Sequence, residues 1–235
     1  MNQQTDPRES LVLSYLSLRK AVGIIGVALP FVLALGNMSL HGHGIKCSIS
    51  NYYYTDMGNV FVGSMCAIGV FLLSTRGYDR RDRIAGYLAC IFALGVALFP
   101  TTPECNPTGE HKITSTLHST SAFLLFLTFA FFCLVLFTQT DKKIPTRRKV
   151  QRNRVYRISG FIILACIVLI VVVKLLVVKL PAVETAVERV KPIFWLESLA
   201  VFTFGVAWLT KGEMILKDEE SAKPAEAAIA GYGQC

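Results

Sequence analysis

Residues 156–178 read YRISGFIILACIVLIVVVKLLVV, an apolar run in which Arg157 and Lys174 are the only charged side chains. A helix needs about 20 residues to cross the hydrocarbon core of a bilayer, so this run is long enough to span a membrane. Five further runs of the same kind lie at 21–36, 57–75, 84–100, 113–138 and 192–210. We therefore expect an all-α fold, a polytopic transmembrane bundle of six spans.

The composition of the whole chain indicates the same class of protein. Of its 235 residues, 53% are hydrophobic and only 17% are charged, and the mean hydropathy is +0.50. These values exclude an ordinary soluble domain. We expect residues 1–210 to form one transmembrane helical domain and residues 211–235 to form a disordered tail. The first run also fits a cleaved signal peptide, because Arg19 and Lys20 precede it and small residues end it at Gly36.

The basic residues predict the orientation of the bundle. Most of the 24 lysines and arginines lie before the first run, in the second and fourth loops, or in the tail. Because cytoplasmic segments of membrane proteins are enriched in Lys and Arg, both termini are predicted to be cytoplasmic. The basic fourth loop could also attract anionic lipid head groups, although topology alone explains its charge. We expect membrane lipids, and no nucleic acid, as partners.

The third run carries a face of small side chains. Ala85, Ala89, Ala93 and Ala97 recur every four residues, with glycine and cysteine beside them. Small faces let helix backbones approach closely in lipid. We expect this face to pack against a neighbouring helix, and it would serve a homo-oligomer equally well.

Two cysteines would lie on the outer side of the membrane. Cys47 is in the first outer loop and Cys105 is in the third. In an oxidising compartment they could form a disulfide that joins the two loops. The sequence leaves the bridged and the reduced state open, because the separation of the two Cα atoms decides between them.

Polar residues occur where the second, fourth and sixth runs would enter the membrane from the outer side. They are Asp56 and Asn59 in the second run, His111, Ser115 and His118 at the fourth, and Glu197 and Ser198 in the sixth. An ionisable group at membrane depth costs free energy, so it usually faces the bundle interior and a partner. We predict an outward-facing polar pocket with Asp56, His118 and Glu197 as catalytic residues, lined also by Asn59, Ser115 and Ser198.

Carboxylate and imidazole groups at one depth could hold Zn²⁺ or another divalent ion. The candidate ligands are Asp56, His111, His118 and Glu197. Each has a structural alternative: His118 could hydrogen-bond Glu197 or a backbone carbonyl to hold helices together, and Asp56 could cap the second helix. No HExxH, HxxxH or paired CxxC motif is present, so metal binding remains one hypothesis among these.

Several short stretches resemble a known family. SISNYYYT at 48–55, VFVG at 60–63, RGYD at 76–79, ALFPT at 97–101 and FWLE at 194–197 together look like a group of bacterial integral membrane proteins known only as a domain of unknown function. The likeness covers most of the chain. It implies a multi-pass protein of the bacterial inner membrane and assigns no activity.

A more distant resemblance is to the CREST superfamily of ceramidase-like membrane hydrolases, which bind zinc. The matching positions are Ser48 or Ser50, Asp56 and His118. That superfamily has seven spans and an HxxxH pair in the last one, where this chain has Glu197. The resemblance implies hydrolysis of a lipid at the outer membrane level.

Three classes of function follow from these observations. The first is a lipid-handling protein or a metal-dependent hydrolase of a lipid amide or ester, in which the ion activates water. The second is a small transporter, channel or proton-coupled sensor, in which His118 and Glu197 relay protons. The third is a non-catalytic membrane assembly protein, in which the same groups only connect helices.

Overall fold

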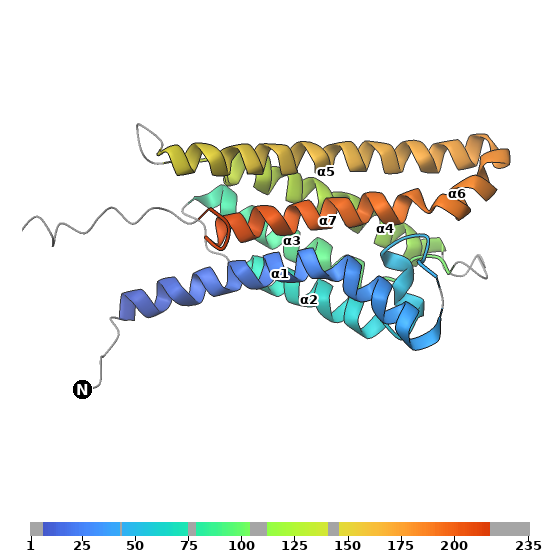
Figure 1. Ribbon diagram of the computed structural model, residues 1–235, viewed down its shortest axis with the longest axis horizontal. Coiled ribbons are helices and arrows are strands. Elements are labelled where there is room, and N and C mark those ends of the chain that lie inside the picture. Colours follow the sequence, from blue (N-terminus) through green and yellow to red (C-terminus); the bar gives the residue numbers. More distant parts are fainter. Residues whose placement is uncertain (1–6, 43, 75–78, 104–111, 141–145, 217–235) are drawn as a thin grey trace, which may run out of the picture.

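The computed structural model describes residues 7–42, 44–74, 79–103, 112–140 and 146–216 (Figure 1). Within these ranges the chain is helical and has no strand, which confirms the expected all-α class. The α-helices are α1 (Pro7–His41), α2 (Gly58–Ser74), α3 (Arg80–Leu98), α4 (Lys112–Phe131), α5 (Arg147–Lys179), α6 (Glu184–Val190) and α7 (Pro192–Lys211). Shorter helical turns are η1 (Ser50–Tyr54), the π-helical η3 (Phe132–Leu136) and η4 (Pro181–Val183).

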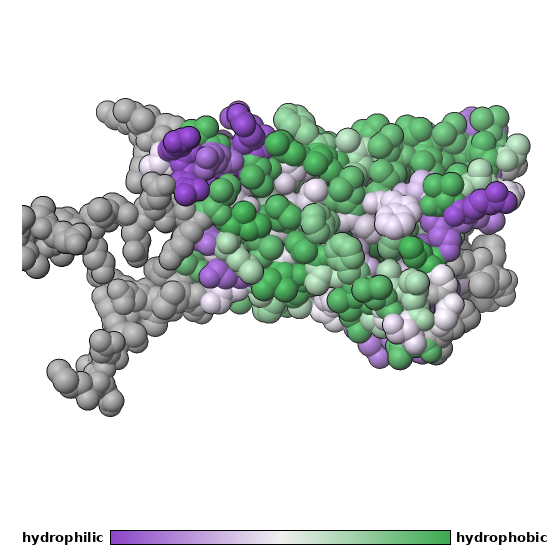
Figure 2. All heavy atoms as spheres, in the orientation of Figure 1, coloured by the Kyte–Doolittle hydropathy of each residue, from purple (hydrophilic) through white to green (hydrophobic). Residues whose placement is uncertain are grey.

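The long helices lie side by side along one axis of the molecule (Figure 1). The start of α1 and the end of α7 are at the same end, and η1 and α6 are at the opposite end. Four helices, α1, α4, α5 and α7, contain stretches long and apolar enough to cross a membrane. On the face in Figure 2, apolar side chains cover the middle of the bundle and hydrophilic ones gather towards its ends, as expected for a protein that faces lipid.

The apolar runs locate the helices but do not mark all of their ends. Helices α2 and α7 begin and end within a residue of the predicted runs, whereas α1 and α5 extend well beyond 21–36 and 156–178. The extra turns of α5 are polar and rich in Lys and Arg, which are good helix formers, whereas those of α1 mix leucines with polar residues. Hydropathy therefore indicates which part of a helix is apolar, whereas helix propensity extends the helix beyond the ends of the apolar run. The short elements η1 and α6 were not predicted.

The small-residue face of α3 packs against α2. Ala85, Ala89, Ala93 and Ala97 are each at most 3% exposed. A Cβ atom added at Gly69 of α2 would lie 3.2 Å from the Cβ of Ala93, so the two backbones are close. The expected close packing is present, and within one chain the small-residue face of α3 contacts α2. Self-association of the protein stays a prediction.

Helices α1 and α7 also meet at glycines. A Cβ atom added at Gly205 would lie 2.7 Å from the Val27 nitrogen and 2.8 Å from the Gly23 oxygen. Any side chain there would overlap the backbone of α1 and force the helices apart. This contact fixes α7, the helix that carries Glu197, against α1.

Aromatic side chains join α4, α5 and α7 at the end away from η1. The rings of Phe129 and Phe204 are stacked with centroids 3.5 Å apart, and Trp208 packs edge-to-face on Phe137 at 5.1 Å. Phe137 in turn contacts Tyr156 of α5. These contacts join the three helices at the end away from η1. The cavity described next lies between the same helices, near η1.

Candidate functional site

The segment before α2 folds onto the end of the bundle. Tyr52 of η1 is fully buried, with its ring beside Phe194 of α7. The Ile49 N–H donates to Glu197 Oε2 at 2.8 Å, and the Tyr54 hydroxyl donates to the Thr101 carbonyl at 2.5 Å. Lys191 donates to the Ile45 carbonyl. Contacts to α7 and to the residues after α3 thus hold a short 3-10 turn in place.

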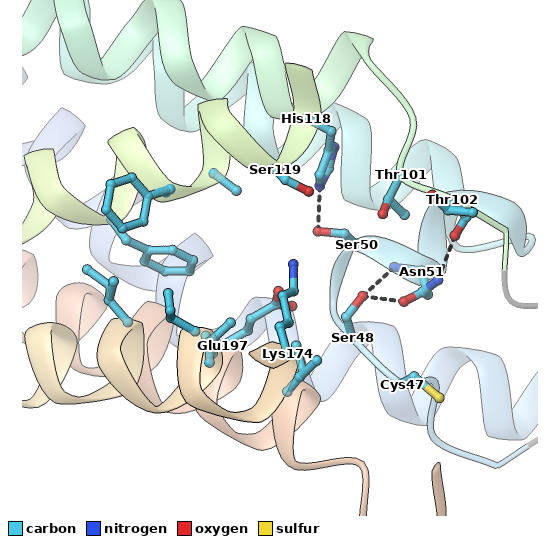
Figure 3. Close-up of a pocket in the computed structure, with 17 residues that line it drawn as sticks. Cys47, Ser48, Ser50, Asn51, Thr101, Thr102, His118, Ser119, Lys174 and Glu197 are labelled. Carbon is cyan, nitrogen blue, oxygen red and sulfur yellow. Dashed lines mark hydrogen bonds between the residues drawn. The ribbon is translucent and has the colours of Figure 1, made fainter. Parts of the chain in front are cut away.

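A cavity of about 340 Å³ lies beside this turn, between α4, α5 and α7. That volume is within the range of small-molecule sites, roughly 300–1,000 Å³. Its polar lining residues are Cys47, Ser48, Ser50, Asn51, Thr101, Thr102, His118, Ser119, Lys174 and Glu197. Its apolar lining residues are Ala122, Phe123, Phe126, Ile167, Ile170, Val171 and Ile193. Figure 3 shows the labelled polar side chains gathered towards the 47–51 and 101–102 segments.

His118 is the most constrained side chain of this cavity. It is 3% exposed; its Nδ1 lies 2.7 Å from the Phe99 carbonyl oxygen, and its Nε2 lies 2.8 Å from Ser50 Oγ. A carbonyl oxygen only accepts, so in the neutral ring the proton is on Nδ1. The Nε2 atom is then an acceptor, and the Ser50 hydroxyl donates to it.

This arrangement is suited to nucleophilic chemistry. A serine hydroxyl that donates to an imidazole can lose its proton as it attacks, and a third group that fixes the imidazole completes such a site. Here the Phe99 carbonyl is the third group. Ser50 also lines the cavity.

Glu197 and Lys174 bring a carboxyl group and an amino group to the same cavity (Figure 3). Glu197 accepts from the Ile49 amide and so connects α7 to η1. Lys174, near the C-terminal end of α5, interacts electrostatically with both Glu197 and His118. Among the described residues Lys174 makes no hydrogen bond or ion pair within contact distance, and its ammonium is directed into the cavity in Figure 3.

The structure brings together some of the predicted site residues and separates others. His118 and Glu197 line one cavity. Asp56 and Asn59 are exposed and do not line it. Ser115 accepts a hydrogen bond from Thr102 at 2.8 Å, beside the cavity. The buried Ser198 hydroxyl has no hydrogen-bond partner among the described residues.

Two predicted residues, His111 and Cys105, lie outside the described residues. The disulfide between Cys47 and Cys105 therefore stays a prediction. Cys47 itself lines the cavity, next to Ser48.

The donors in the described ranges do not fit a zinc site. No three His, Cys, Asp or Glu side chains come together there in a way that could hold a metal ion. Both ring nitrogens of His118 are hydrogen-bonded to protein oxygens. An ion on Nε2 would have to displace Ser50, and Asp56 is not near enough to line the same cavity.

Sequence reasoning from the residues alone did not select Ser50. It entered only through the distant resemblance, as one of two serines in SISN, and Lys174 was not among the predicted site residues. A serine in a polar loop carries no periodic signal, so its position beside His118 had to come from tertiary structure. The polar SISN stretch directly before the buried Tyr52 was the available hint.

No known family model, curated protein or solved structure matches this chain. Because one helical fold can host many activities, function has to be argued from the site.

Proposed function

We propose that the protein is an integral membrane hydrolase that cleaves an ester or amide bond of a lipid, with Ser50 as nucleophile and His118 as general base. The observation that carries this proposal is the position of His118 Nε2, 2.8 Å from Ser50 Oγ, while Nδ1 is fixed by the Phe99 carbonyl. The cavity beside this pair is polar at one end and apolar at the other, which suits an amphipathic substrate.

The proposed reaction has two halves. Ser50 Oγ attacks the carbonyl carbon of the substrate and its proton passes to His118 Nε2. The tetrahedral intermediate collapses, and the leaving alcohol or amine takes the proton from Nε2 as its bond to the acyl group breaks. Water then attacks the acyl-serine, gives one proton to Nε2, and releases the free acid as that proton returns to Ser50.

The charged residues of the cavity have supporting roles in this proposal. Glu197 accepts a hydrogen bond from the N–H of Ile49, the residue before the nucleophile, and so positions Ser50. Lys174 supplies positive charge on the opposite wall, where it would stabilise an anionic group of the substrate or a developing oxyanion.

We further propose that α2 and α3 cross the membrane together with α1, α4, α5 and α7, which gives six spans. Both termini would be cytoplasmic, and the cavity would face the outer side of a bacterial inner membrane. The enrichment of Lys and Arg in the first half of α1, just before and within the start of α3, before and within the start of α5, and at and after the end of α7 supports this orientation.

The proposal is tested by labelling the purified protein in nanodiscs with a fluorophosphonate, which forms a phosphorus–oxygen bond to an activated serine and releases fluoride. Mass spectrometry should locate the adduct on Ser50. Ser50→Ala and His118→Gln should abolish it. Ser119→Ala is the matched control, because Ser119 lines the same cavity but is not the residue bonded to His118.

Unlabelled wild-type protein, or labelling of Ser50 that is unchanged in a folded His118→Gln variant, would overturn the proposal. In that case the Ser50–His118 pair would be a connection between helices, as expected of an assembly protein. Flux of protons or solute in liposomes that Glu197→Gln abolishes would instead favour a transporter.

A further inference from the structure

We infer that the cavity opens sideways to the bilayer between α4 and α5, and that its apolar part holds one acyl chain of a membrane lipid. This inference deepens the proposed function, on which it rests, because it names the substrate as a lipid that reaches Ser50 from within the membrane. It is carried by three observations on the lining residues: their order along the helices, their exposure and their chemistry.

The lining changes from polar to apolar along the same two helices. On α4 the polar residues His118 and Ser119 are followed by Ala122, Phe123 and Phe126. Phe126 is roughly 12 Å along the helix axis from His118, at 1.5 Å per residue. The cavity therefore extends from its polar end over about the thickness of one leaflet's hydrocarbon, roughly 15 Å.

On α5 the lining also changes from polar to apolar, but the polar residue comes last along the chain because α5 runs in the opposite direction to α4 (Figure 1). Lys174 lines the polar part, and Val171, Ile170 and Ile167 line the part further from the end of the helix. Ile167 is roughly 10 Å along the axis from Lys174. The polar head of a lipid would thus lie near Ser50 and Lys174, with its chain directed along both helices towards the bundle centre.

The apolar part of the cavity reaches the side of the molecule. Phe123 of α4 and Val171 of α5 line the cavity, yet each is 43% exposed. Only 17% of the most apolar stretch of α5 is buried, so the other described helices leave most of this stretch uncovered. At hydrocarbon depth, such an opening faces lipid chains.

The chemistry of the opening favours an acyl chain over a polar solute. Phe123 and Val171 at the mouth and Ala122, Ile167 and Ile170 behind it offer no hydrogen bonds from their side chains. A lipid already in the bilayer reaches this site without crossing water.

The test uses a phosphatidylcholine that carries a diazirine in the middle of one acyl chain, in vesicles with the full-length Ser50→Ala protein. After irradiation, cross-links should occur on cavity-lining residues of both helices, in particular Phe126 and Ile167. A Val171→Trp substitution, which fills the mouth, should lower these cross-links about tenfold, the effect of roughly 1.4 kcal/mol.

Val168→Trp is the matched control. Val168 is on the same helix, is 60% exposed and does not line the cavity, so Trp at this position should leave the cavity cross-links unchanged. Cross-links confined to outward-facing residues such as Val168, or an equal effect of both Trp variants, would overturn the inference.

The cross-linking result and the catalytic proposal fail separately. Cross-links at Phe126 and Ile167 without fluorophosphonate labelling of Ser50 would mean a lipid-binding protein with no serine hydrolase activity. Labelling of Ser50 by the fluorophosphonate without lipid cross-links would keep the catalytic proposal and remove the lateral entry. If both hold, wild-type protein should release fatty acid from the bilayer lipid, and Val171→Trp should lower this rate relative to that for a soluble butyrate ester.

Discussion

His118 Nε2 and Ser50 Oγ are 2.8 Å apart, although 68 positions separate the two residues in the chain. The contact joins α4 to η1, and the Phe99 carbonyl at the end of α3 fixes the other ring nitrogen. Three segments that are distant in sequence thus meet at one imidazole. The pair lies beside a cavity whose polar part also holds Glu197 and Lys174, so that a reacting group could approach the serine.

Replacement of Glu197 should separate a positioning role from a charge role. Glu197→Ala removes the acceptor of the Ile49 amide and should lower stability by about 1–3 kcal/mol, the cost of a buried donor without a partner. Glu197→Gln keeps an oxygen acceptor and should lose less. Thermal unfolding in detergent measures both. Equal stability of the two variants would show that the hydrogen bond from Ile49 does not hold η1.

Glycine at 205 should be required for the contact between α1 and α7. Gly205→Ala places a methyl group 2.7 Å from the Val27 nitrogen and should destabilise the protein by about 1–3 kcal/mol. Gly63→Ala is the control, since nothing lies within 4 Å of its added Cβ atom, and alanine is the better helix former. Unfolding temperatures compared in one detergent test this prediction, which fails if Gly205→Ala is as stable as Gly63→Ala.

Lys174 should favour substrates with an anionic head group. Its ammonium lies in the cavity and makes no ion pair with a described residue, so Lys174→Met should lower hydrolysis of an anionic lipid about tenfold more than that of a neutral one, a difference of roughly 1.4 kcal/mol. Lys174→Arg should restore the preference. Rates on phosphatidic acid and diacylglycerol with the same chains provide the comparison. An equal loss on both lipids would assign Lys174 to another role.

Hydrolysis should not depend on a divalent ion. The proposed proton transfer runs directly between Ser50 and His118, and both imidazole nitrogens are already bonded to protein oxygens. Incubation with EDTA, followed by removal of the chelator, should leave the rate and the fluorophosphonate labelling unchanged. Loss of both that added Zn²⁺ restores would support the metal hypothesis, with His111 as a ligand to be examined next.

Much of the fold could be predicted from hydropathy and small-residue spacing. The run at 156–178 lies within α5 and the run at 192–210 within α7, because apolar runs long enough to span lipid have few alternatives to a helix. The alanines of α3 are buried, as their four-residue spacing indicated. The same reasoning missed η1, since a short turn held by tertiary hydrogen bonds has no periodic pattern.

The candidate site was predicted only in part. Reasoning from the helix ends expected His118 and Glu197 in one region, and both line one cavity, because each lies near the start of its helix and α4 and α7 run in the same direction (Figure 1). It could not tell that Asp56, at a similar depth, is on the exposed side of the chain. The direction of a side chain depends on how the helix is rotated against its neighbours, and that rotation is set by packing.

The sequence by itself determined that this chain is a helical bundle with several apolar helices, because burial of the backbone in lipid requires helices and the runs show where they are. Only the tertiary structure decided which polar groups meet. The pairing of Ser50 with His118 depends on the Glu197 contact that holds η1, on the Gly205 contact that fixes α7, and on the end of α3 at Phe99. These are packing relationships between distant segments, and no local pattern of residues encodes them.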